Sequence, residues 1–207
     1  MLGLEDNIQK IKGIGAKKAE LFAKLHIDTV RSLVYTLPMR YETYQFCNSL
    51  SEIKAEGCVV FYIQYNGGAA EHMSMGGNRY IQYLYREPGG AVRFVWFNQP
   101  YLLKTLQRGA IYRVVTRVEY GSGVWNAVNP KLTRVERKKS GEPNFMEPIY
   151  SAVAGLKSHE ISKYIALALS DLGPLEDGLP EDIRYQYGLD DIETALRKAH
   201  QPLCFII

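Results

Sequence analysis

The stretch that decides the fold is VRFVWFNQPY at residues 92–101. Its first half alternates in the way typical of a β-strand, and a polar turn with a proline follows it. Trp96 and Phe97 are adjacent, so a strand points them to opposite faces and they cannot share one core. Phe97 and Tyr101 could stand together on an exposed tip, where two rings can stack on bases. The spacing alone favours the alternative, in which both rings cap a hydrophobic core.

Strand patterns continue on both sides of this stretch. Strands are expected over 58–65, 79–86, 91–97, 111–120 and 124–135, with a glycine-rich loop at 67–77, a short helix over 100–107 and a break near Asn129. Three strands, a short helix and two strands is the order of an OB-fold, a small Greek-key barrel that commonly binds oligonucleotides. We therefore predict an α+β protein, in which a central five-stranded OB-fold β-barrel is flanked by N-terminal and C-terminal helices.

The flanking segments have helical apolar spacing. Residues 1–46 read as helical, and further helices are expected from Ser158 as a cap, from a first-turn Pro180, and from a cap at Asp190 or Asp191. The predicted organisation has three regions. They are a helical region at 1–50, an OB-fold domain at 51–140, and a linker with helices at 141–207.

Composition indicates an ordinary soluble globular protein of 207 residues, with 46% hydrophobic and 23% charged residues. The net charge of +3 is too mild to indicate nucleic-acid binding by itself. Three cysteines without paired spacing and four scattered histidines predict no metal site, no cofactor and no disulfide framework. No signal peptide or membrane-spanning run is present in the sequence, and we expect a cytoplasmic protein.

The segment IKGIGAKKA at residues 11–19 is typical of the hairpin in a helix–hairpin–helix element. Two glycines permit a tight turn, and the start of the next helix offers N–H groups to a phosphate. Lys17 and Lys18 add positive charge at the same place. The hairpin could equally serve only to join two packed helices.

Other basic residues are candidate phosphate contacts. Arg134 and Arg137 belong to the densest basic run, although such a run is usually a solvated face. Arg79 and Arg93 interleave with tyrosines on the second and third strands, in the pattern Arg79, Tyr83, Tyr85 and Arg93 that a single-strand-binding face would have. No nucleophile–base arrangement and no phosphate-binding GxxxxGK[ST] motif occurs in the sequence.

Together these pieces resemble the N-terminal wedge region of RecG, an ATP-dependent DNA helicase family that remodels branched DNA. The resemblance is carried by IKGIGAKKAEL at 11–21, LPMRYE at 37–42, FNQPYL at 97–102, Asn129-Pro130, PIY at 148–150 and ALRKAHQP at 195–202. The chain departs from the family pattern in its glycine- and methionine-rich loop at 67–77 and at residues 151–154. It ends where the motor domains would begin, and its apolar last residues, 203–207, suggest an interrupted chain.

The resemblance implies sequence-independent binding of branched or single-stranded DNA, such as forks and junctions met in DNA repair and recombination. It implies that Phe97 and Tyr101 stack on opened bases, and that basic residues of the OB-fold line the path of the DNA arms. The expected phosphate contacts are Lys17, Lys18, Arg79, Arg93, Arg134 and Arg137. We expect a monomer without ATPase or helicase activity of its own.

Two other functions remain open at this point. An OB-fold groove could instead hold a partner peptide, such as the tail of a single-strand-binding protein. The chain could also be the noncatalytic arm of a helicase whose motor lies on another chain.

Overall fold

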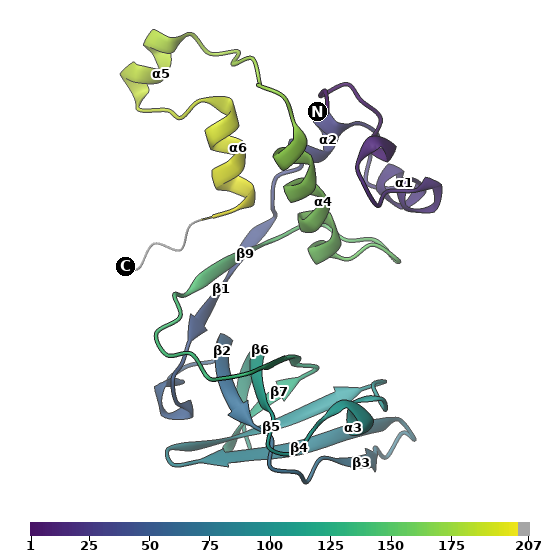
Figure 1. Cartoon of the computed structure of the whole chain (residues 1–207), viewed down its shortest axis with the longest axis vertical. Helices are drawn as coiled ribbons and strands as arrows, with labels where there is room; N and C mark the ends of the chain where they lie inside the picture. The colour runs from purple at the N-terminus through teal and green to yellow at the C-terminus, as the bar shows by residue number, and fades with distance from the viewer. Residues whose placement is uncertain (203–207) are drawn as a thin grey trace. The chain divides into compact units, whose positions relative to one another are not determined.

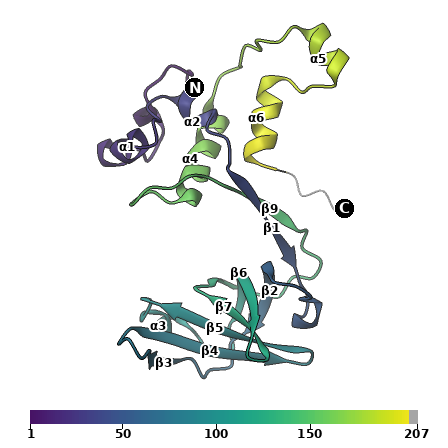
Figure 2. The same ribbon diagram turned by 180° about the vertical axis from the view of Figure 1, so that it is seen from behind.

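The computed structural model describes residues 1–202 (Figures 1 and 2). Contacts divide the chain into two compact units. The central unit is Thr43–Phe145, and the terminal unit joins Met1–Glu42 to the chain from Met146 onward. The apolar run at 203–207 that suggested an interrupted chain lies outside the described residues. The division into three regions at 1–50, 51–140 and 141–207 stays a prediction.

Strands make up most of the central unit. The strands are β1 (Arg40–Phe46), β2 (Gly57–Gln64), β3 (Ala70–Met73), β4 (Arg79–Glu87), β5 (Gly90–Phe97), β6 (Ile111–Gly121), β7 (Val124–Val128), β8 (Lys131–Val135) and β9 (Phe145–Ile149). The first residues of β1 and all of β9 but Phe145 belong to the terminal unit. Two short helices, η2 (Leu50–Glu52) and α3 (Leu102–Thr105), lie between them. Pairing follows the order β3-β4-β5-β7-β6-β2-β1-β9, with β8 paired to β6.

The larger hydrophobic core of the central unit includes residues of β4 and β5, and Phe46, Val60 and Tyr62 form a smaller, separate cluster. On β4 the alternate residues Ile81, Tyr83 and Tyr85 are buried, and on β5 the partners Val92, Phe94 and Trp96 are buried opposite them. Residues of β2, β6 and β7 join the same cluster. Period-two burial of this kind is what a sheet with one face on a core produces. The hairpin between β4 and β5 turns at Gly89, whose φ of +106° favours glycine and where a Cβ would meet Ser51 at 2.9 Å.

The sequence predicted most strands of the central unit correctly, but it also predicted a closed barrel, which the pairing does not show. All five expected strands are present, and the last is divided into β7 and β8 at the predicted break near Asn129. The expected loop at 67–77 contains the short strand β3, which was not predicted. In the part of the chain that the structure describes, β2 does not pair with β4, and that pairing would be needed to close the strands into a barrel. The structure is therefore a mixed α+β fold, and the closed five-stranded barrel is not confirmed.

Two strands outside the predicted OB-fold domain, β1 and β9, were missed, and they pair with each other. Residues 40–46 were expected to be helical but form β1, which runs parallel to β2 with Tyr44 opposite Cys58. The expected linker after residue 140 contains β9, where Phe145 stacks on Tyr44 with ring centroids 4.8 Å apart. Pairing between strands about a hundred residues apart leaves little signal in the sequence of either strand, because a strand residue is stabilised mainly by packing against its cross-strand neighbours.

The terminal unit is helical. It contains η1 (Ile8–Lys10), α1 (Ala16–Ala23), α2 (Val30–Val34), α4 (Ser158–Asp171), α5 (Glu181–Tyr187) and α6 (Ile192–His200). Helices α1, α2 and α4 lie together (Figure 1), around a core that includes Phe22, Leu33 and Ile161. None of the described helices is long and apolar enough to cross a membrane.

The helix caps are partly as predicted. Asp191 caps α6 by accepting a hydrogen bond of 2.9 Å from the Thr194 N–H, which confirms one of the two expected caps. Ser158 was predicted to cap α4, but the cap position is Lys157, and the Ser158 hydroxyl instead accepts from the Tyr150 N–H at 2.9 Å. Pro180 takes the cap position of α5 and not a position in its first turn.

The last helix of the terminal unit is fastened by a buried histidine. His200 is 4% exposed, its Nε2 lies 2.7 Å from the Val34 carbonyl oxygen, and its Nδ1 lies 2.8 Å from the Tyr150 hydroxyl. A carbonyl can only accept, so Nε2 carries the proton and Nδ1 accepts from tyrosine. Burial lowers the pKa of His200, against a smaller opposite effect of the Val34 hydrogen bond. The neutral imidazole is therefore the form that fits.

Acid is expected to destabilise the terminal unit through His200. The folded pKa is lowered, so its contribution to stability is complete above the unfolded value of about 6.5 and is lost as the pH falls toward the folded value. Thermal unfolding measured between neutral pH and about pH 5 should show a falling midpoint. His200→Gln should be less stable at neutral pH but should lose less on acidification. Equal pH dependence of the two proteins would contradict this role.

Candidate nucleic-acid interface

The loop from Phe97 to Tyr101, the wedge loop, presents two rings to solvent. Trp96 is only 1% exposed, whereas Phe97 is 39% and Tyr101 56% exposed. This confirms the predicted separation of the two adjacent rings of β5, with Trp96 in the core and Phe97 outside. It contradicts the alternative in which Phe97 and Tyr101 cap the core. Their role in binding stays a prediction.

The wedge loop is braced by the break between β7 and β8. Asn129 accepts at its Oδ1 from the Phe97 N–H at 2.9 Å and from the Gln99 side chain at 3.3 Å. Next to it, the Pro130 carbonyl accepts from the Trp96 indole N–H at 3.0 Å. These bonds fix the backbone at the exposed ring.

Tyr101 is held from the other end of the wedge loop. Its hydroxyl donates to Gln99 Oε1 at 3.0 Å. Tyr101 occupies the N-cap position of α3 without a side-chain cap bond, and the first residue of that helix, Leu102, is buried in the central core. Both exposed rings thus stand on a fixed backbone, and little conformational entropy remains to be lost when they bind.

A third and a fourth ring extend the exposed surface from Phe97. Tyr80 of β4 faces Phe97 across the strand pair, with ring centroids 5.7 Å apart. His72 of β3 faces Tyr80 in turn, with centroids 5.6 Å apart and planes inclined by 23°. Sequence reasoning missed His72 and Tyr80 as site residues, because only the register of β3, β4 and β5 brings them together. We call His72, Tyr80 and Phe97 the ring ladder.

The predicted interleaving of tyrosines and arginines on the strands was wrong for the tyrosines. Tyr83 is 5% and Tyr85 6% exposed, so both belong to the core and not to a binding face. The Tyr85 hydroxyl donates to Glu87 at 3.1 Å, and desolvation raises its pKa. A tyrosine can be buried in this way when its hydroxyl finds a partner.

Four of the six predicted phosphate contacts lie on the central unit. Arg79 begins β4, its side chain 72% exposed and 3.8 Å from Glu71. Arg93 of β5 donates to Asn126 at 3.2 Å. Arg134 of β8 donates to Gln107 at 2.6 Å, and the exposed Arg137 follows that strand. Arg79 and Arg93 therefore share a hairpin with Phe97, whereas Arg134 and Arg137 belong to β8 and the chain after it.

The two remaining predicted phosphate contacts, Lys17 and Lys18, differ in whether their ammonium groups are free to bind DNA. Lys17 is exposed at the start of α1, where Gly15 is the cap residue. The Lys18 ammonium donates to the Tyr164 hydroxyl at 2.9 Å and to Glu160 at 3.1 Å, and these bonds raise its pKa. The Tyr164 hydroxyl in turn donates to the Gly13 carbonyl at 3.0 Å. Lys18 therefore fastens the hairpin to α4, and only Lys17 is left to meet a phosphate.

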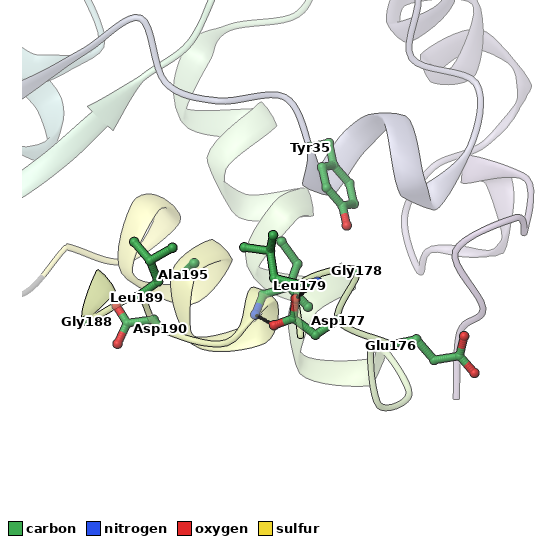
Figure 3. A pocket seen from close by; sticks show the side chains of 10 residues that line it. Tyr35, Glu176, Asp177, Gly178, Leu179, Gly188, Leu189, Asp190 and Ala195 are labelled. Carbon is green, nitrogen blue, oxygen red and sulfur yellow. Dashed lines mark hydrogen bonds between the residues drawn. The ribbon is translucent and has the colours of Figure 1, made fainter. Parts of the chain in front are cut away.

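A hollow in the terminal unit has the wrong charge for nucleic acid. Its volume is about 500 Å³, and carboxylates of Glu176, Asp177 and Asp190 stand among apolar side chains such as Leu179 (Figure 3). The N–H groups of Leu179 and Ile192 donate to Asp177 and hold the pKa of that carboxyl below its usual value. Arg184 pairs with Asp177 at 3.6 Å and Lys198 with Asp190 at 2.8 Å. Among the described residues, the lining itself contains no lysine or arginine to bind a phosphate, so this hollow is not part of the candidate interface.

No group of three or more histidine, cysteine or acidic side chains that could hold a metal ion occurs within residues 1–202. The candidate site is therefore a surface of rings, amides and guanidinium groups. Such a surface can stack on bases and contact phosphates.

Comparison with known proteins places the chain in a family. A solved structure described as RecG bound to a three-way DNA junction matches 96% of this chain and 27% of its own length, with a TM-score of 0.75 and 23% identity. ATP-dependent DNA helicase RecG of Staphylococcus epidermidis (strain ATCC 12228) is 29% identical over 95% of this chain. The same helicase of Staphylococcus aureus (strain MSSA476) is 28% identical.

The chain spans 28% of the length of each of these two helicases. A family model described as the RecG wedge domain matches residues 7–172. With the match covering most of the chain, from the hairpin through β9 and α4, the protein belongs to the RecG wedge domain family.

Proposed function

We propose that this chain binds branched or single-stranded DNA without reading its sequence, as the DNA-gripping wedge of a RecG-like helicase. The observation that carries the proposal is the braced pair of exposed rings, Phe97 and Tyr101. Exposed rings on a rigid loop can stack on bases opened at a branch point, because every base offers a stacking face. A solved relative with the same fold is described as bound to a three-way DNA junction.

We further propose that the central unit is an OB-fold barrel of the partly open kind. The strands β4, β5, β7, β6 and β2 follow one another in the sheet, and β5 and β7 run parallel. All five contribute to one core cluster. A sheet whose strands all contribute to one core is curled around it, as in a small barrel.

The test is a comparison of DNA structures. A three-way junction should bind more tightly than a linear duplex of the same length and base composition, because only the junction exposes bases to the rings. Fluorescence anisotropy at fixed salt measures both affinities. An acidic tail peptide assayed beside them covers the alternative of a peptide-binding module. Equal affinities for junction and duplex, or binding of the peptide alone, would contradict the proposal.

Salt should weaken binding steeply, because phosphate contacts release counterions. Each contact contributes about 0.9 to the slope of log affinity against log salt on duplex DNA. Lys17→Ala should lower the slope by roughly one contact and leave the unfolding midpoint unchanged. Lys18→Ala is the matched control, because its ammonium is bound to Glu160 and Tyr164. It should lower the unfolding midpoint and leave the slope nearly unchanged.

The reverse result for this lysine pair would remove the hairpin from the interface. Arg79, Arg93, Arg134 and Arg137 can be tested by the same slope measurement. A slope that no arginine variant changes would remove the central unit's cations from the proposed path of the DNA.

We propose that the chain has no ATPase of its own. The relatives named as ATP-dependent helicases are more than three times its length, since the chain spans 28% of each, and its sequence contains no GxxxxGK[ST] motif. DNA-stimulated ATP hydrolysis by this chain alone would contradict this proposal. A cytoplasmic monomer is the state in which we expect it to act.

A further inference from the structure

A hollow of about 420 Å³ lies beside the ring ladder in the central unit. It is lined by residues 77–81, from the end of the β3–β4 turn into β4, and by residues 96 and 98–100, from the end of β5 into the wedge loop. Glu71 of β3 completes the lining. A volume of this order is typical of small-ligand pockets.

The strand beside this hollow does not serve the core. All four residues of β3 are exposed. The side chains of Met73, its last residue, and Met75, two residues later, are 64% and 109% exposed. Strand β3 pairs with β4, its His72 ring stacks on Tyr80, and its Glu71 lies 3.8 Å from Arg79. A strand that buries nothing but positions a ring next to a hollow indicates a binding role.

The hollow offers an aromatic wall and hydrogen-bonding groups together. Tyr80 lines it and is the middle ring of the ladder. Asn78 and Asn98 both line it, and among the described residues neither amide side chain has a hydrogen-bond partner. An amide has both donors and an acceptor, so it can pair with the edge of any base.

The charge beside the hollow suits a phosphate. Arg79 lines it and its guanidinium lies 3.8 Å from Glu71, in a pair whose side chains are 72% and 40% exposed. An exposed pair at that distance contributes little, so the guanidinium can turn to a phosphate, which it binds through two parallel bonds.

We propose that this hollow receives one unpaired base of a DNA strand that leaves the branch point. The base packs against the part of the Tyr80 ring that lines the hollow, the amides of Asn78 and Asn98 meet its edge, and Arg79 holds the adjoining phosphate. This inference rests on the proposed function and adds a site to it. In this proposal the wedge loop separates the strands at the junction, and the hollow binds one of the bases that this separation unpairs.

The test uses a three-way junction with one unpaired nucleotide at the branch point, and the same junction with an abasic nucleotide there. Tyr80→Ala should weaken binding of the first about fivefold or more and leave the second nearly unchanged. Tyr80→Phe keeps the ring and should bind as the parent does. Tyr120→Ala removes a tyrosine that is 59% exposed on β6 and is the matched control.

A fluorescent base analogue, 2-aminopurine, reports the contact between the base and the Tyr80 ring. Its emission at the unpaired position should be quenched by the parent protein and by Tyr80→Phe, but much less by Tyr80→Ala. Asn98→Gly removes an amide while keeping the left-handed backbone, φ +57°, and should also weaken binding to the junction with the base present.

Failure of the inference and failure of the proposed function give different results. If Tyr80→Ala weakens both junctions equally, or neither, the hollow does not hold a base. If the junctions bind no better than duplex and the variant with both Phe97 and Tyr101 replaced binds as the parent does, the wedge assignment itself is wrong.

Discussion

Replacing Phe97 and Tyr101 together by alanine is expected to weaken binding to a three-way junction about tenfold or more. Stacking on a base contributes roughly 1–3 kcal/mol per ring. Both rings are exposed, with the Phe97 N–H bonded to Asn129 and the Tyr101 hydroxyl bonded to the Gln99 side chain. Neither ring belongs to the core, so the unfolding midpoint should change little. Anisotropy titration with the junction and thermal unfolding of the same sample measure the two quantities.

Two controls make this result specific. Tyr185 and Tyr187 on α5 are 90% and 67% exposed, so their joint replacement removes a similar ring area elsewhere. That variant should bind as the parent does. Phe97→Tyr with Tyr101→Phe keeps both rings and should also keep affinity. A double alanine variant that binds the junction normally would remove the wedge loop from the interface.

The strand signal of residues 92–97 predicted the most informative feature of the site. A period of two forces Trp96 and Phe97 to opposite faces, and the structure buries the one and exposes the other. The period alone does not say which face is the core. For this reason Tyr83 and Tyr85 were misassigned to the binding face, although they alternate with the same regularity as Phe94 and Trp96.

Contacts between distant residues could not be predicted from the sequence. Lys18 was chosen for its charge, but its partner Glu160 is 142 residues away and no local pattern connects them. The stacking of His72 on Tyr80 depends on the pairing of β3, a short strand inside a glycine-rich segment. Register in such a strand is weakly specified by its own residues, so the ring ladder becomes visible only in three dimensions.

The hydrogen bonds from Asn129 to the wedge loop were partly predictable from the sequence. The sequence predicted a break near Asn129, and the structure gives the break a function. Asn129 has a φ of +48° there, a conformation that asparagine tolerates better than most residues. Its side chain holds the Phe97 backbone, and the adjoining Pro130 carbonyl holds Trp96. The break in the strand therefore connects the core to the exposed ring.

Trp96→Ala is expected to have the largest effect on stability, about 3–5 kcal/mol of the free energy of unfolding of the central unit. Trp96 is 1% exposed, its ring centroid lies 5.6 Å from that of Phe94, and its indole N–H donates to Pro130. Replacement by alanine leaves a cavity and an unpaired carbonyl. Trp96→Phe fills most of that volume and should lose only the hydrogen bond, about 1–3 kcal/mol.

Urea unfolding followed by circular dichroism measures these losses, and Phe97→Ala at the next position is the matched comparison. Because their side chains point to opposite faces, Trp96→Ala should reduce stability severely, and Phe97→Ala should reduce junction affinity with little change in stability. Trp96→Phe, which stays folded, should also bind more weakly than the parent, because Pro130 adjoins the Asn129 brace. If Phe97→Ala were the more destabilising change, the order of faces on β5 would be reversed, and the ring proposed to meet DNA would be a core residue.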